Sequence, residues 1–91
     1  MSVSVRIPTQ LRELSGGQSE VDVDGDTVAA VLAGLEARHP GFAHRLHDDS
    51  GSLRRFVNVF VADEDIRFLQ GVDTAVKDGD TVSIVPAVAG G

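Results

Sequence analysis

The chain has 91 residues, no cysteine and a formal net charge of −6. This length predicts one domain with a single core and leaves no room for a second, catalytic domain. The lack of cysteine excludes disulfides, iron–sulfur clusters and thiolate catalysis on this chain. The acidic charge argues against nucleic acid and for a basic protein partner. No apolar run reaches the ~18 residues of a membrane span and no signal peptide is evident, so we expect a cytoplasmic protein without membrane contact.

The first two predicted elements are β-strands. Residues 2–8 alternate between apolar and polar side chains, and Pro8 limits further pairing at that end. After a turn at 15–17, a second alternating run carries acidic residues on its other side. We expect the two strands to form a hairpin, with these side chains on its apolar face: Val3, Val5, Ile7, Val21 and Val23.

An amphipathic helix is predicted from Thr27 onward. Asp26 or Thr27 can cap its first turn, and Pro40-Gly41 stops it. Residues 41–54 are the least regular stretch and are expected to form a loop. The apolar residues of the helix fall at i, i+3, i+4 and i+7 and share one face: Val28, Val31, Leu32 and Leu35.

Residues 55–62 are expected to form a central strand whose two faces differ in character. The valines would point to the core, and the other face would carry two aromatic rings on either side of Asn58. The inward residues are Val57, Val59 and Val61, and the outward rings are Phe56 and Phe60. These rings would mark a partner surface if they are exposed, whereas a flap of residues 41–54 could equally cover them.

Short elements complete the predicted fold. A turn at 63–65 leads to a short apolar piece at 66–69, residues 72–76 have room for a single helical turn, and a turn at 77–80 precedes a last strand at 81–85. The order β-β-α-β-(β)-β predicts an α+β protein of the β-grasp type. In this fold a mixed sheet of four to five strands packs on one main helix, and the first and last strands pair in the middle.

The chain stops on Gly90-Gly91, directly after a strand-like run. Glycine has no Cβ, so the terminal carboxylate and its approach path stay free of side-chain bulk. Such an end suits insertion into the active site of another protein and conversion to an acyl-adenylate. The alternative is a frayed tail without a function. We expect a folded domain over 1–86 and a flexible tail over 87–91.

Other polar constellations have simpler interpretations. Two carboxylate pairs share strand faces, but no nucleophile accompanies them. A group of histidines and aspartates near the helix end contains residue types that bind zinc, but its spacing matches no known kind of site. We therefore expect solvated polar surfaces and no metal site at Asp22/Asp24, at Asp63/Asp65, or at His39, His44, His47, Asp48 and Asp49.

Taken together, these features resemble the MoaD/ThiS family of sulfur-carrier proteins, which are ubiquitin-like in fold. The similarity lies in the β-grasp order, the 78–80 turn and the ending 85–91, and it covers nearly the whole chain. Residues 56–68 together with 86–91 are most similar to the actinobacterial CysO type. The connection 41–54 is longer than in the shortest members, so no partner surface is carried over to it.

The resemblance implies a defined chemistry at Gly91. A ubiquitin-activating-type enzyme uses ATP to adenylate this residue, a sulfur donor replaces AMP, and the carrier leaves as a thiocarboxylate. A second enzyme takes up the sulfur. For the CysO type this is a PLP-dependent cysteine synthase, which places the carrier in cysteine biosynthesis or a related sulfur-transfer pathway. The carrier itself is expected to catalyse nothing and to bind no cofactor.

The terminal segment is expected to enter the partner enzyme. Six extended residues from Pro86 reach about 20 Å, which is enough to enter a buried site from the surface. The stem of this segment is slim and uncharged, and it consists of Ala87, Val88, Ala89 and Gly90. We expect the free carrier to be a monomer.

The sequence alone does not distinguish a sulfur carrier from proteins with two other functions. A ubiquitin-like modifier would use the same adenylated Gly91 to form an isopeptide bond with a target lysine, and both chemistries begin with the same acyl-adenylate. A non-reactive binding domain would carry its Gly-Gly ending by chance.

Overall fold

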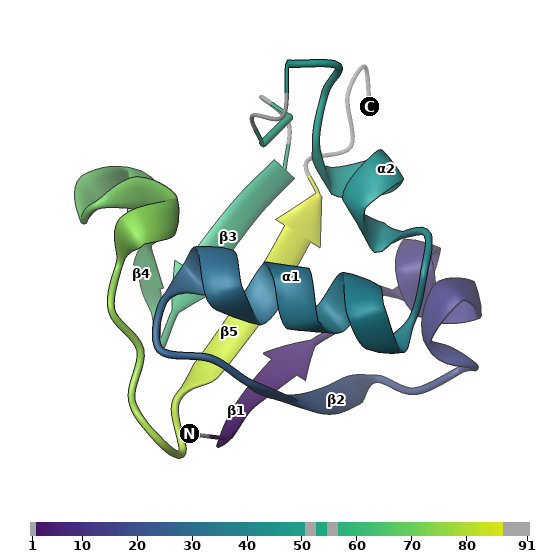
Figure 1. The fold of residues 1–91 in the computed structure, drawn as a ribbon, viewed down its shortest axis with the longest axis horizontal. Helices are drawn as coiled ribbons and strands as arrows, with labels where there is room; N and C mark the ends of the chain where they lie inside the picture. The colour runs from purple at the N-terminus through teal and green to yellow at the C-terminus, as the bar shows by residue number, and fades with distance from the viewer. Residues whose placement is uncertain (1, 51–52, 55–56, 87–91) are drawn as a thin grey trace.

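The computed structural model describes residues 2–50, 53–54 and 57–86, and Figure 1 shows their arrangement. A five-stranded sheet with the order β2-β1-β5-β3-β4 lies behind one main helix, α1 (Val28–Arg38). The predictions for Phe56 and for the terminal segment 87–91 lie outside the described residues. The strands are β1 (Ser2–Arg6), β2 (Glu20–Asp24), β3 (Val57–Val61), β4 (Glu64–Asp65) and β5 (Thr81–Pro86).

The sheet is mixed, as the sequence predicted. β1 and β2 form the expected antiparallel hairpin, with Val3 opposite Val23 and Val5 opposite Val21. β1 and β5 run parallel, and β3 is antiparallel to both β5 and β4. The first and last strands therefore pair in the interior, which confirms the β-grasp. The strand predicted at 55–62 as central is interior but lies one place off the middle, which β5 occupies.

The core lies between the sheet and α1. Alternation along each strand places the valines inward, and Val59 is only 1% exposed. Val57 is also buried, while Val61 is half-buried and packs against the core, so the predicted faces of β3 are confirmed. Each fully buried side chain of this size contributes about 1.5–3 kcal/mol relative to exposure. The helix adds its predicted stripe of Val28, Val31, Leu32 and Leu35, all buried.

The start of α1 is fixed by one of the two predicted caps. The hydroxyl of Thr27 accepts a hydrogen bond from the backbone N–H of Ala30 at 3.1 Å, which satisfies an otherwise unpaired donor of the first turn. Farther along, α1 lies close to β2, because a Cβ added at Gly34 would be 2.6 Å from a methyl carbon of Val23. Glycine at this position permits the approach.

The segment predicted as a loop at 41–54 contains a helix, α2 (Phe42–Leu46). Its first and last residues, four positions apart, share one helix face and are both buried in the core. Gly41 precedes the helix with a φ of 117°, a conformation that glycine adopts without the strain of a side chain. The prediction of an irregular loop was therefore wrong for this part, because burial of two large side chains stabilises a helix too short to form alone.

Three 3₁₀ helices complete the described part of the fold. η1 (Thr9–Ser15) follows β1 and buries Leu11, which the sequence pattern did not predict. η2 (Ile66–Phe68) occupies the predicted short apolar piece. η3 (Gly71–Asp73) supplies the predicted helical turn, beginning one residue before the expected 72–76.

Candidate functional site

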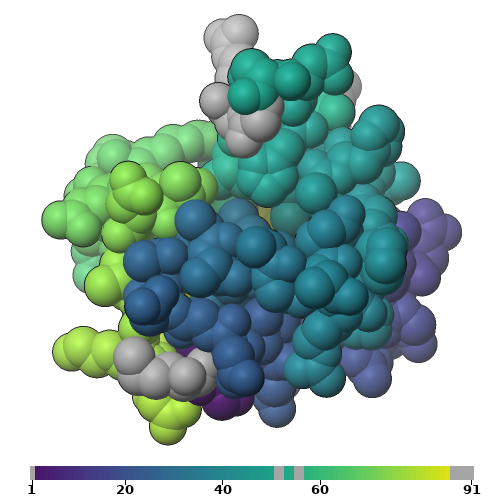
Figure 2. All heavy atoms as spheres, viewed as in Figure 1, coloured from purple at the N-terminus to yellow at the C-terminus, as the bar shows by residue number. Residues whose placement is uncertain are grey.

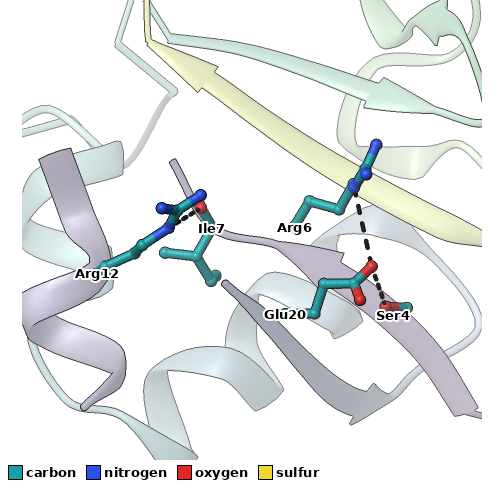
Figure 3. Close-up of polar contacts among 5 residues, drawn as sticks. All are labelled: Ser4, Arg6, Ile7, Arg12 and Glu20. Carbon is teal, nitrogen blue, oxygen red and sulfur yellow. Dashed lines mark hydrogen bonds and ion pairs between the residues drawn. The ribbon is translucent and has the colours of Figure 1, made fainter. Parts of the chain in front are cut away.

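The sheet face away from α1 carries mostly polar side chains. The strand register places Arg6 next to Ser83, and Ser83 next to Phe60. Arg6 Nε lies 3.8 Å from Glu20 Oε2, and Ser4 Oγ donates to the same oxygen at 3.4 Å, as Figure 3 shows. Both members of the ion pair are well exposed, so it contributes at most about 1 kcal/mol. Among the described residues, Phe60 is the aromatic ring on this mostly polar outer face.

The backbone at the end of β1 is held by a different arginine. Arg12 of η1 donates from Nε to the carbonyl oxygen of Ile7 at 3.2 Å, which Figure 3 also shows. Two residues before Ile7, Val5 pairs with Val82 in the parallel β1–β5 ladder. This contact ties η1 to the strand that lies beside β5.

Phe60 is half-buried on the outer face. α2 packs with α1 on the opposite side of the sheet, and Phe42 and Leu46 point into the core there. The described residues of 41–54 therefore do not form the flap that the sequence left open as an alternative. The other half of that predicted pair, Phe56, lies outside the described residues.

The last described residues are anchored in the sheet interior. Pro86 is opposite Val57, and Val85 is opposite Asn58. Val85 points to the outer face and is 45% exposed, so it adds apolar area one strand away from Phe60. β5 pairs with β1 over Thr81 to Ser83 and with β3 as far as Pro86, so pairing with β3 holds Pro86 in the sheet. The predicted reactive residue, Gly91, lies five positions farther on, outside the described residues.

The sequence did not identify the most exposed aromatic ring of the described chain. Phe68, at the end of η2, is 87% exposed, and Leu69 is 40% exposed. Ile66 of the same turn is buried. A 3₁₀ helix has three residues per turn, so residues 66 and 68 cannot lie on the same side. A single turn has no repeat, so the pattern at 66–69 carries no signal that separates its inward from its outward positions.

The candidate metal and carboxylate groups stay apart or have structural partners. The described residues contain no group of three or more His, Asp or Glu side chains placed to hold a metal ion. The His39 ring lies edge-on to the Phe42 ring, with 6.5 Å between the two ring centroids. Asp48 Oδ1 accepts a hydrogen bond from the Ser50 backbone N–H at 3.0 Å. Asp22 and Asp24 point outward from β2 into solvent.

Figure 2 shows the α1 side of the molecule, where the surface is hollowed between α1 and α2. The hollow has a volume of about 750 Å³ and a mainly apolar lining. Glu36 is among the lining residues, but its carboxylate already accepts a hydrogen bond from the Gly41 backbone N–H at 2.8 Å.

None of the helices in the described part of the chain has both the length and the hydropathy that crossing a bilayer requires.

Comparison with known proteins decides the family. The model of the ThiS family matches residues 5–91. The chain belongs to the ThiS family. This ThiS-family chain is 55% identical over 93 residues to the sulfur carrier protein CysO of Mycobacterium tuberculosis, with all of both chains covered.

Two further relatives of this ThiS-family chain carry different names, one a CysO protein and the other a modifier protein. A chain in the crystal structure of the Amycolatopsis orientalis BexX/CysO complex is 49% identical with a TM-score of 0.91, covering 98% of this chain and 99% of that one. The small archaeal modifier protein 3 of Haloferax volcanii is 42% identical over 94 residues, with both chains fully covered.

Proposed function

We propose that the chain is a sulfur carrier that acts through Gly91. The observation that carries the proposal is the full-length similarity to proteins named sulfur carrier protein CysO, together with a Gly-Gly ending five residues after an anchored strand. The folded domain supports this proposal, because pairing with Val57 holds Pro86, the residue from which the terminal segment starts, in the sheet.

The proposed chemistry has two activating steps. A carboxylate oxygen of Gly91 attacks the α-phosphorus of ATP on a ubiquitin-activating-type enzyme, which forms the acyl-adenylate and releases pyrophosphate. A sulfur donor then displaces AMP and leaves a thiocarboxylate. The chain contributes delivery and orientation, which is the positional part of catalysis, and acts as a protein co-substrate.

The sulfur is then transferred to a second enzyme. A PLP-dependent cysteine synthase is the acceptor that we propose, with Ala87, Val88, Ala89 and Gly90 as the stem that enters its active site. The BexX/CysO complex supports the general idea that a related chain binds a partner protein. We place the carrier in the cytoplasm, where ATP-dependent enzymes act, and we expect it to be a monomer when free.

The outer face of the sheet is our proposed partner surface near the base of that segment. Phe60 and the neighbouring Val85 are partly exposed there, and Phe56 is the third member predicted from the sequence. Burial of these side chains on binding would favour the complex, because exposed apolar area is removed from water. The surrounding polar residues would keep the free carrier soluble.

The test of the proposed function is deletion of Gly91. The purified chain is incubated with the activating enzyme, ATP and a sulfur donor, and its intact mass is measured for a sulfur-for-oxygen exchange. We expect the exchange in the wild type and in the exposed-site control Gln10→Ala, and none in the deletion variant. Circular dichroism should show the same fold in all three. Sulfur acquisition by the deletion variant would refute the proposal.

The Haloferax volcanii relative favours one second candidate, a ubiquitin-like modifier conjugated through Gly91 to lysines. Intact mass analysis of the protein from its native cell distinguishes the two functions. A thiocarboxylate without conjugates supports the carrier, whereas a ladder of high-mass conjugates that disappears in the Gly91-deleted protein supports the modifier.

A further inference from the structure

Phe68 and Leu69 form an exposed apolar pair, which we call the η2 knob. The ring of Phe68 is 87% exposed, and Leu69 is 40% exposed beside it. The other described phenylalanines, Phe42 and Phe60, are buried and half-buried. The green segment that contains η2 and η3 forms the left margin of the molecule in Figure 2.

The backbone of the knob is held in place by several contacts. Asp65 Oδ1 accepts from the Arg67 backbone N–H at 2.8 Å, and the Leu69 N–H donates to the Ile66 carbonyl at 3.0 Å. Ile66 itself is buried in the core. The ring of Phe68 is therefore carried by an ordered turn, and ordering this backbone costs little on binding. Aromatic side chains, phenylalanine included, are enriched at the centres of protein interfaces.

The charges around the knob indicate the chemistry of its partner. Asp63 and Glu64 precede η2, and Asp73 belongs to η3, which packs against η2. All three carboxylates are exposed, and Arg67 is the cation on the turn itself. An acidic rim on a chain of net charge −6 is repelled by nucleic acid, by anionic membranes and by a second copy of the chain. It complements an apolar pocket that is rimmed by lysine or arginine.

A side-chain contact connects the turn of the knob with β3, the strand that pairs with the base of the terminal segment. Arg67 of η2 donates from Nη2 to the carbonyl oxygen of Val57 at 3.1 Å, and Val57 pairs with Pro86. The Arg67 side chain therefore reaches from the knob's turn to the residue of β3 that pairs with Pro86. An enzyme that holds Gly91 in its active site, within about 17 Å of Pro86 for five extended residues, can contact Phe68 at the same time.

We propose that the η2 knob docks into an apolar, basic-rimmed pocket on the enzyme that activates Gly91; this inference rests on the proposed function, because it names that partner. The activating enzyme is the partner that meets the carrier with an ordinary carboxylate. The segment Ala87 to Gly91 is chemically plain, so the folded domain must distinguish this carboxylate from others. The knob supplies apolar area and shape for this recognition.

The test compares Phe68→Ser with Phe68→Leu. Isothermal titration calorimetry measures the Kd of each purified chain for the purified ubiquitin-activating-type enzyme of the same organism. We expect Phe68→Ser to raise the Kd about tenfold or more, and Phe68→Leu to stay within about threefold of the wild type, because leucine keeps an apolar side chain on the turn. Thermal melting should be the same for all three, since an exposed ring contributes little to the folded core.

The outcomes distinguish failure of the docking proposal from failure of the proposed function. An unchanged Kd for Phe68→Ser overturns the knob, and so does an equal loss in Phe68→Leu, because apolar contact would then not be the cause. Binding of the wild type to anionic vesicles or self-association in the ultracentrifuge, abolished by Phe68→Ser, would also overturn it by assigning another occupant. Intact mass at saturating enzyme tests the proposed function separately: Phe68→Ser should still acquire sulfur, and failure of the wild type to do so would refute the function instead.

Discussion

At the scale of single residues, Val59 shows how strictly the two sides of β3 differ. Its side chain is 1% exposed, whereas the neighbouring Asn58 is half-buried on the outer face. We expect Val59→Asp to destabilise the domain by several kcal/mol, on the order of the cost of burying an unpaired carboxylate. Thermal melting followed by circular dichroism measures this. The matched variant Asn58→Asp adds the same group on the outer face and should shift the midpoint far less; equal shifts would contradict the account.

Residue-level prediction succeeded where a side chain belongs to a regular period. The alternation along β1 and β3 was enough to place Val5 and Val59 inward. Residue-level prediction failed at Phe68, because a single turn between two strands has no repeat from which its buried side can be predicted. The reactive residue Gly91 remains a prediction from the sequence, since it lies outside the described residues.

At the scale of elements, the cap of α1 can be tested directly. Thr27→Ala removes the acceptor of the Ala30 N–H, and we expect a loss of about 1 kcal/mol in the free energy of unfolding. Urea unfolding with an unchanged m-value would report this loss. Thr27→Ser keeps the hydroxyl and should restore most of the stability, and the exposed Thr9→Ala serves as a control. A loss of the same size in Thr9→Ala would mean that the cap is not the cause.

Long elements with a sustained period were predictable, and short ones were not. The helix at 28–38 offers four apolar positions on one face, which is a clear signal. α2 offers only Phe42 and Leu46, and its stability comes from their contacts with distant core residues rather than from its own sequence. The same reasoning explains why η1 was missed.

At the scale of the whole molecule, the net charge of −6 should govern how fast the chain meets the activating enzyme that we propose for it. We expect the association rate constant to fall as ionic strength rises, because salt screens long-range attraction to a basic surface. The dissociation rate should change little, since short-range packing is poorly screened. Stopped-flow measurements at low and high salt separate the two rates. An association rate indifferent to salt would count against electrostatic steering.

The position of β5 also determines when during synthesis the domain can fold. β5 is the last described element to leave the ribosome, yet it joins β1 to β3 and is hydrogen-bonded on both sides. A nascent chain without it holds two separated halves of a sheet, with exposed edges at β1 and β3. Closing the loop from β1 to β5 is a long-range event, which slows folding. A product truncated before β5 cannot complete the core, so proteolysis of unfolded chains would remove carriers that lack the base of the terminal segment.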